Sequence, residues 1–189
     1  MKILFAQGNP DKKYEHTRHN TGFLVLDTLG KKYNATWRDI DKYKSRISDM
    51  TIDGEKIILV KPLSYYNDTG LVARTLCDYY KLDAEKDFLV VHDDLSLPLG
   101  TVRVRASGSD AGNNGIKSLN AHLGPLYTRI RVGIWTDMRD KMDDVSFVLG
   151  TFPKNEQESL DSVIIPHVIE LMESFFKGTL QISSSSLTD

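Results

Sequence analysis

Apolar runs typical of strands alternate along this chain with stretches of helical periodicity. The runs are short and each ends in polar or turn residues, as buried strands do; they cover residues 3–6, 56–60, 88–91 and 130–134. Apolar positions recur at helical spacing within residues 21–33, 72–80, 116–123 and 157–176. This alternation predicts an α/β fold, a single mixed β-sheet flanked by helices on both faces.

Turn and cap residues divide these elements. Asp53-Gly54 joins the strand patterns at 44–51 and 56–60 and predicts a tight hairpin. Asn20 stands immediately before a helical pattern, where an N-cap residue is expected.

The rest of the chain predicts one domain. No repeat or linker divides residues 1–180, and the helix at 157–176 is interrupted at Pro166. Residues 137–144 are polar and are expected to form a mobile loop. The run of four serines at 183–186 predicts a disordered tail over residues 181–189.

Composition excludes several classes of protein. Hydrophobic residues make up 40% and charged residues 26%, as in ordinary globular domains. The longest apolar run is much shorter than the roughly 20 residues of a transmembrane helix, and the N-terminal run is too short for a signal-peptide core. Cys77 is the single cysteine, so no intramolecular disulfide can form and a cytoplasmic location is expected.

Charge is unevenly distributed along the chain. The net charge of −2 by itself argues mildly against a nucleic-acid ligand. However, residues 1–139 hold 21 Lys and Arg against 17 Asp and Glu, a net of +4, whereas residues 140–189 hold 3 against 9, a net of −6. The body of the chain is therefore basic, and the acidity lies toward the C-terminus.

Polar residues that follow the apolar strands are the candidates for chemistry. Open α/β sheets bind ligands beyond their strand ends, where we expect Asn9, His19, Asn67, Asp93 and Asn114. Taken singly, each is more simply explained as a turn, cap or surface residue. Together they could supply a base, a carboxylate that orients it and several neutral hydrogen-bond donors.

Other reaction classes have less support. The sequence contains no G-x-S-x-G, H-E-x-x-H, Walker A or G-x-G-x-x-G motif. Cys77 lies in a helical pattern among apolar residues and is expected to be a buried structural thiol. His16 and His19 have H-x-x-H spacing and could join His92 at a metal, but metal-free acid–base chemistry is simpler, so we expect no metal and no cofactor.

Six motifs follow one another along the chain. They are Gly8-Asn9-Pro10 with Tyr14 and Thr17-Arg18-His19-Asn20-Thr21-Gly22, then Lys61-Pro62-Leu63-Ser64-Tyr65-Tyr66-Asn67-Asp68-Thr69-Gly70, Val91-His92-Asp93-Asp94-Leu95, Gly112-Asn113-Asn114-Gly115-Ile116-Lys117, Arg129-Ile130-Arg131-Val132-Gly133-Ile134 and Val148-Leu149-Gly150-Thr151-Phe152. In order and spacing they resemble the motifs of bacterial-type peptidyl-tRNA hydrolases, over about residues 3–178.

The resemblance implies hydrolysis of the ester bond between peptide and tRNA, which recycles tRNA after aborted translation. His19 would be the general base and Asp93 would orient it, while Asn9, Asn67 and Asn114 would position water and substrate. Further substrate contacts are implied for Tyr14, Tyr66 and Asn113. Contacts to tRNA phosphates are implied for Arg103, Arg105, Lys117 and Arg131. The partner would be peptidyl-tRNA, and the resemblance suggests a monomer with no membrane and no obligate protein partner.

Some positions depart from the family pattern. Tyr66 stands where Met is usual, Ser96 where Asp is usual, and Asp110 and Asn113 where Gly and His types are usual. These changes predict altered substrate binding with the reaction retained. The alternative is a non-catalytic RNA-binding relative, which would not need His19 and Asp93.

Overall fold

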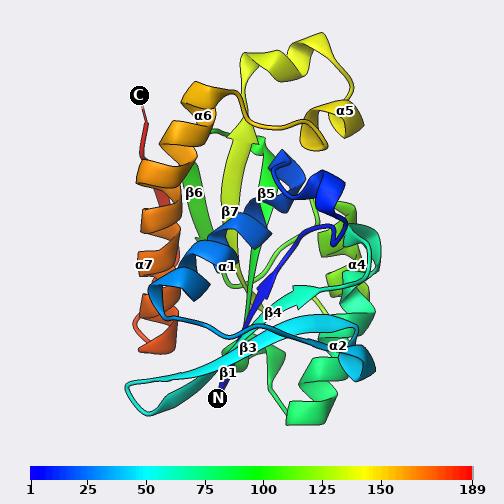
Figure 1. Ribbon diagram of the computed structural model, residues 1–189, viewed down its shortest axis with the longest axis vertical. Helices are drawn as coiled ribbons and strands as arrows, with labels where there is room; N and C mark the ends of the chain where they lie inside the picture. The colour runs from blue at the N-terminus through cyan, green and yellow to red at the C-terminus, as the bar shows by residue number, and fades with distance from the viewer. Residues whose placement is uncertain (189) are drawn as a thin grey trace.

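The strands of residues 1–188, which this computed structural model describes, form one eight-stranded mixed sheet (Figure 1). In chain order they are β1 (Lys2–Ala6), β2 (Arg38–Ile40), β3 (Ser45–Ile52), β4 (Glu55–Pro62), β5 (Phe88–Pro98), β6 (Thr101–Arg105), β7 (Thr128–Trp135) and β8 (Ser183–Ser186). Their order across the sheet is β2-β3-β4-β1-β5-β7-β6-β8. The predicted α/β class and mixed sheet are confirmed.

The four central strands run parallel, and their apolar runs lie side by side. Leu4 of β1 pairs with Leu59 of β4 on one side and with Leu89 of β5 on the other. All three side chains are fully buried. Parallel strands covered on both faces need apolar residues at every position, which explains why these runs lack alternation.

Helices cover both faces of the sheet, as predicted. They are α1 (Thr21–Lys32), α2 (Thr69–Tyr80), α3 (Ala84–Asp87), α4 (Asn114–Leu123), α5 (Asp144–Val148), α6 (Lys154–Ser159) and α7 (Ile165–Phe176). Helices α1 and α7 pack on one face and α2 and α4 on the other, which gives two separate apolar cores (Figure 1). The sheet between these cores holds its strand ends, and the loops that leave them, in fixed positions.

The Asp53-Gly54 hairpin is confirmed. Asp53 and Gly54 have φ angles of 50° and 80°, the left-handed conformation that both central residues of a type I′ turn require. The turn joins β3 and β4, which pair antiparallel from Ser45–Pro62 to Ile52–Glu55.

The C-terminal helix is widened rather than broken near Pro166. One π-helical turn, Leu160–Ile164, connects α6 to α7, and Pro166 lies in the first turn of α7. Proline lacks the N–H that would bond to the residue four positions earlier, so the chain widens locally and then continues as a helix.

The serine-rich tail differs from the predicted disorder. Ser183–Ser186 form β8, an edge strand antiparallel to β6, with Ser184 opposite Arg103. Leu180 and Leu187, on either side of the serines, pack against the apolar core beneath α7. Because strand pairing uses backbone groups, two anchored flanking leucines are enough to hold a serine segment in register.

Within residues 1–188, no helix has the length and apolar character that crossing a membrane would require.

Candidate active site

The loops that follow β1 and β4, the segment Asp93–Ser96 within β5 and the loop before α4 surround one cavity of about 500 Å³. Eight residues that the sequence singled out line it, namely Asn9, Tyr14, His19, Tyr66, Asn67, Asp93, Asn113 and Asn114. Helix α5 lies beyond these strand ends and contributes Asp144 and Val145 to the lining (Figure 1). The structure therefore brings together residues as far apart in the sequence as Asn9 and Val145.

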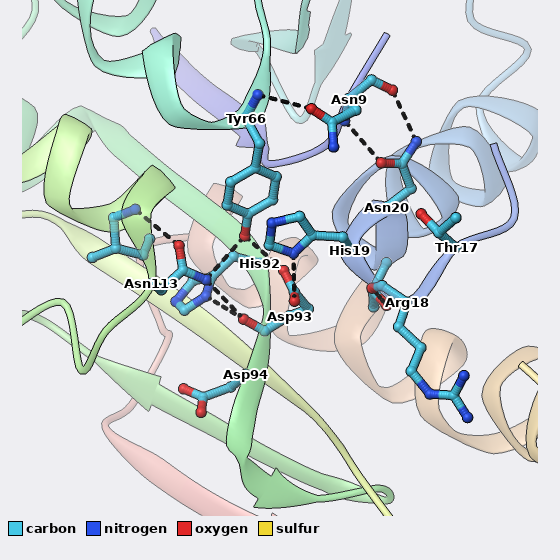
Figure 2. Close-up of polar contacts among 12 residues, drawn as sticks. Asn9, Thr17, Arg18, His19, Asn20, Tyr66, His92, Asp93, Asp94 and Asn113 are labelled. Carbon is cyan, nitrogen blue, oxygen red and sulfur yellow. Dashed lines mark hydrogen bonds and ion pairs between the residues drawn. The ribbon is translucent and has the colours of Figure 1, made fainter. Parts of the chain in front are cut away.

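His19 and Asp93 form the central pair of this cavity (Figure 2). His19 lies in the 3₁₀ turn Arg18–Asn20 before α1, and its Nδ1 is 2.8 Å from Oδ2 of Asp93. The Asp93 side chain is 2% exposed and that of His19 is 17% exposed. Because an ionised carboxylate only accepts hydrogen bonds, Nδ1 of His19 is the donor, and in the neutral ring the lone pair is on Nε2.

Tyr66 lies against both members of this pair. Its hydroxyl donates to Oδ1 of Asp93 at 2.6 Å, and its ring stacks on the His19 imidazole with centroids 3.6 Å apart and planes 14° from parallel. Burial and the neighbouring Asp93 carboxylate raise the pKa of Tyr66 well above its usual value, which keeps the hydroxyl protonated.

Asn9 joins the first strand end to the Tyr66 loop (Figure 2). Its Oδ1 accepts from the backbone N–H of Tyr66 at 3.0 Å, so its Nδ2 is oriented as a donor. Asn20 makes two bonds to the Asn9 backbone, with its Oδ1 accepting at 2.8 Å and its Nδ2 donating at 3.0 Å. Asn20 occupies the N-cap position of α1, as predicted, but its side chain makes no capping bond and holds the Asn9 loop instead.

Arg18 anchors the turn that carries His19. Its guanidinium is 2% exposed and donates to the Thr151 carbonyl at 2.6 Å and to Oε2 of Glu156 at 2.5 Å. It also lies over the rings of Phe147 and Phe152, 4.4 and 4.9 Å from their centroids. Sequence reasoning missed this anchor, because no local pattern links Arg18 to a glutamate 138 positions away.

His92 packs behind Asp93 and stays neutral. Its Nδ1 lies 2.7 Å from the Asp93 carbonyl oxygen and donates to it. Burial lowers the pKa of His92 to about 4. In the described part of the chain, no group of three or more His, Cys, Asp or Glu side chains is arranged to hold a metal ion.

Cys77 is the buried thiol that the sequence predicted. It is a residue of α2 whose side chain lies in the apolar core, and burial raises the pKa of Cys77 to about 11. The thiol therefore stays protonated near neutral pH.

Arginines gather on two neighbouring strands outside the cavity. Arg103 of β6 is directly opposite Arg131 of β7, and Arg105 is opposite Arg129. Paired residues point to the same face, so the four guanidinium groups share one side of the sheet while Val102 is buried on the other. Arg129, which the sequence reasoning did not include, differs from the other three because it is buried and donates to the Ser109 carbonyl at 2.9 Å. Lys117 is exposed near the start of α4.

Several of these arginines already have protein partners. Arg131 donates to Oδ2 of Asp94 at 2.6 Å. Arg103 and Arg105 reach β8, where they bond to the Ser184 hydroxyl at 3.1 Å and the Ser183 carbonyl at 3.0 Å. The β8 strand thus lies beside the arginine cluster.

Helix α7 carries Glu170 and Glu173 of the acidic C-terminal part, whereas Asp140, Asp143 and Asp144 lie on the segment next to the cavity. Residues of α7 in the acidic C-terminal part pack against Val102, Val104 and the alternate positions of β7. The arginines occupy the opposite positions on the same strands and project to the other face. The arginine-bearing face is therefore not the one covered by the acidic helix.

Comparison with known proteins identifies the relatives of this chain. The family model for peptidyl-tRNA hydrolase matches residues 3–188. The chain belongs to the peptidyl-tRNA hydrolase family.

Members of the peptidyl-tRNA hydrolase family are similar to this protein in sequence and structure over most of its length. The peptidyl-tRNA hydrolase of Fusobacterium nucleatum is 43% identical over 164 residues, which cover 87% of this chain and 84% of that protein. That of Bacillus cytotoxicus is 42% identical over 183 residues, 96% of this chain and 97% of the relative. The crystal structure of peptidyl-tRNA hydrolase from Acinetobacter baumannii superimposes with a TM-score of 0.85 at 29% identity, covering 94% of this chain and 89% of that one.

Proposed function

We propose that this protein hydrolyses the ester bond between the peptide and the terminal ribose of peptidyl-tRNA, with His19 as general base. The observation that carries this assignment is the His19–Asp93 pair, which lies in the wall of the cavity next to the central strands of the sheet. The family relatives support the substrate class, since they are named for it.

The reaction follows from the tautomer of His19. Nδ1–H is bonded to Asp93, so Nε2 takes a proton from water while the water oxygen bonds to the ester carbonyl carbon. The tetrahedral intermediate then expels the ribose oxygen, which receives the proton from His19. General-base catalysis of this kind contributes about 10²–10⁴-fold. An ester has a better leaving group than an amide, so a nucleophilic side chain is not required.

Neutral amides supply the donors of this site. Asn9 points a donor toward the cavity because Tyr66 holds its oxygen, and Asn67 and Asn114 are exposed at the cavity wall. We assign to Asn9 and Asn114 the positioning of the water and the carbonyl, and to Asn67 the peptide backbone. Donors aimed at the developing oxyanion lower the barrier without adding charge.

The arginine cluster supports a tRNA phosphate site. Within the described residues Arg103 and Arg105 bond only to neutral groups, whereas Arg131, opposite Arg103, is paired with Asp94. A bound phosphate chain would supply the missing negative charge, which favours a role for Arg103 and Arg105, with Arg131 beside them, in holding tRNA. Lys117 extends the same proposal to the start of α4. Contacts to the backbone alone suit an enzyme that accepts many tRNAs.

A non-catalytic RNA-binding role is the alternative. A binding scaffold has no need for a buried carboxylate such as Asp93, whose desolvation is unfavourable unless its hydrogen bonds are made. The unfavourable desolvation of Asp93 has a function if the His19–Asp93 pair performs acid–base chemistry, which favours the enzyme over the binding scaffold.

The decisive experiment is hydrolysis of an N-blocked aminoacyl-tRNA by the wild-type protein, His19→Ala and His122→Ala. We expect turnover by wild type and by His122→Ala, whose histidine lies on α4 outside the cavity, and a loss of at least about 100-fold for His19→Ala. No turnover by wild type would exclude the proposed activity. Equal turnover by wild type and His19→Ala would exclude His19 as the base.

A further inference from the structure

The two positions that depart most visibly from the family motifs, Tyr66 and Asn113, are hydrogen-bonded to each other (Figure 2). Nδ2 of Asn113 donates to the Tyr66 hydroxyl at 3.0 Å, and that hydroxyl donates to Oδ1 of Asp93 at 2.6 Å. The same nitrogen makes a longer contact of 3.4 Å with the Asp93 carbonyl. Both side chains therefore bond to the carboxylate partner of His19 or to its backbone.

The N-terminus of α4 determines which group donates in each of these hydrogen bonds. Oδ1 of Asn113 accepts from the backbone N–H of Ile116 at 3.0 Å and caps the helix. The cap orients the amide, so Nδ2 must face Tyr66. A hydroxyl that accepts from Asn113 has its single proton free for Asp93, which as a carboxylate can only accept. Oδ2 of Asp93 is then left for the Nδ1–H of His19.

Packing holds Tyr66 in this arrangement. Its side chain is 2% exposed. One face of the ring stacks on His19, and the ring lies so close to Gly115 that a Cβ at that position would overlap it. The hydroxyl is thus committed to Asp93 and Asn113 by the surrounding chain.

We propose that Tyr66 and Asn113 are positioning residues that act through Asp93 to fix the orientation and tautomer of His19. This inference rests on the proposed function of His19 and Asp93. It replaces the substrate contacts that the sequence suggested for Tyr66 and Asn113 with a role behind the base. The hydrogen bond from Tyr66 also draws charge from the carboxylate, which moderates how strongly Asp93 stabilises protonated His19.

The test compares Tyr66→Phe with Tyr127→Phe in steady-state hydrolysis across pH. Tyr127 is a matched control, because it is also fully buried and its hydroxyl donates to Asn120 of α4 at 2.8 Å, away from the cavity. For Tyr66→Phe we expect kcat to fall about tenfold with KM unchanged, within the roughly 100-fold that misplacing a catalytic group can cause. The acid limb of its kcat profile should move to higher pH, because Asp93 then holds the imidazolium more strongly. Tyr127→Phe should lower only thermal stability.

Other ionisable groups around His19 are common to both variants. Tyr14, Tyr65, Asp94, Asp110, Arg139 and Asp144 line the same cavity. His92 lies behind Asp93, and Arg18 points away toward Glu156. Since none of these is altered, the difference between the two profiles reports the Tyr66 hydroxyl.

A second variant, at Asn113, tests the same series of hydrogen bonds in case Tyr66→Phe also lowers the stability of the protein. Asn113→Ser keeps a good helix cap but removes the donor to Tyr66. We expect kcat to fall about threefold in the wild-type background and not to fall further in Tyr66→Phe, because Asn113 acts through the hydroxyl. Additive losses, or a rise in KM with unchanged kcat and pH profile, would assign both residues to substrate binding and overturn the inference. An active wild type, an inactive His19→Ala and an unaffected Tyr66→Phe would reject this inference alone.

Discussion

Arg18 and Glu156 form a buried ion pair, with the guanidinium Nη2 2.5 Å from the carboxylate Oε2. The pair connects the residue next to His19 with the first turn of α6, and its side chains are only 2% and 10% exposed. Because Arg18 also bonds to the Thr151 carbonyl and lies over Phe147, the turn that carries His19 is fixed from the side opposite Asp93.

Removing the Arg18 side chain should therefore lower the stability of the fold. We expect Arg18→Ala to lower the free energy of unfolding by about 3–5 kcal/mol, since it leaves the Glu156 charge buried without a partner. Arg18→Lys should recover only part of this, because an ammonium cannot reproduce the planar, two-partner geometry. Urea denaturation measures the effect. The exposed Arg46–Asp39 pair provides a control, and Arg46→Ala should cost about 1 kcal/mol or less. Equal losses for Arg18→Ala and Arg46→Ala would contradict the proposed anchor.

Replacing Asp93 by Asn should reverse the tautomer of His19. Tyr66 would still donate to the remaining oxygen of the side chain, so the new amide nitrogen would face Nδ1 of His19. That nitrogen can only donate, so Nδ1 of His19 must accept and the ring proton moves to Nε2. A protonated Nε2 in the neutral ring cannot take a proton from water. We expect kcat to fall by at least about 100-fold with the fold intact. Asp87→Asn, the same change at the other end of β5, should retain activity. A kcat for Asp93→Asn within a few-fold of wild type would disprove the orienting role.

Local signals were sufficient for much of the fold. The apolar run at 88–91 lies in β5, and Asp53-Gly54 forms the predicted hairpin, because burial on both faces and a left-handed turn each restrict nearby residues directly. The cavity position of His19 also followed from strand-end reasoning. These features depend on residues close together in sequence or on a general property of α/β sheets.

Features that depend on distant partners could not be predicted in this way. The serines of β8 carry no strand signal, and they are ordered because Leu180 and Leu187 pack on the core beside the open edge of β6. Asn20 has the sequence of a cap, but its side chain bonds to Asn9, which lies close only in the folded chain. The bond from Tyr66 to Asp93 joins the loop after β4 to a residue of β5 that is 27 positions away, so no local pattern predicts it.

Acid should destabilise the protein through His92. In the unfolded chain His92 takes up a proton near its usual pKa of about 6.5, whereas burial delays this to about 4 in the folded protein. Between these values the unfolded state holds the extra proton, so the stability that neutral His92 provides is complete above pH 6.5 and is lost as pH falls toward 4. The shift corresponds to about 3 kcal/mol. Denaturation of wild type and His92→Gln at several pH values measures it.

The difference between the two stability profiles is the relevant quantity, because carboxylates also titrate at low pH. We expect His92→Gln to lose less stability than wild type between pH 6.5 and 4. His122→Gln, which removes an exposed histidine from α4, should follow wild type. Parallel profiles for His92→Gln and wild type would show that His92 does not remain neutral in the folded protein.

The arginine cluster should control the salt dependence of substrate binding. Arg103→Ala combined with Arg105→Ala removes one member of each like-charged cross-strand pair. We expect KM to rise at low salt and the slope of log KM against log salt concentration to fall by about 1–2, because each phosphate contact releases close to one counterion. The control is Arg38→Ala with Arg46→Ala, the same change of charge on β2 and β3 at the opposite edge of the sheet. That double variant should retain the slope of wild type, since only charges near bound phosphate displace counterions. Equal changes in both double variants would mean that net charge, rather than this arginine cluster, attracts the tRNA.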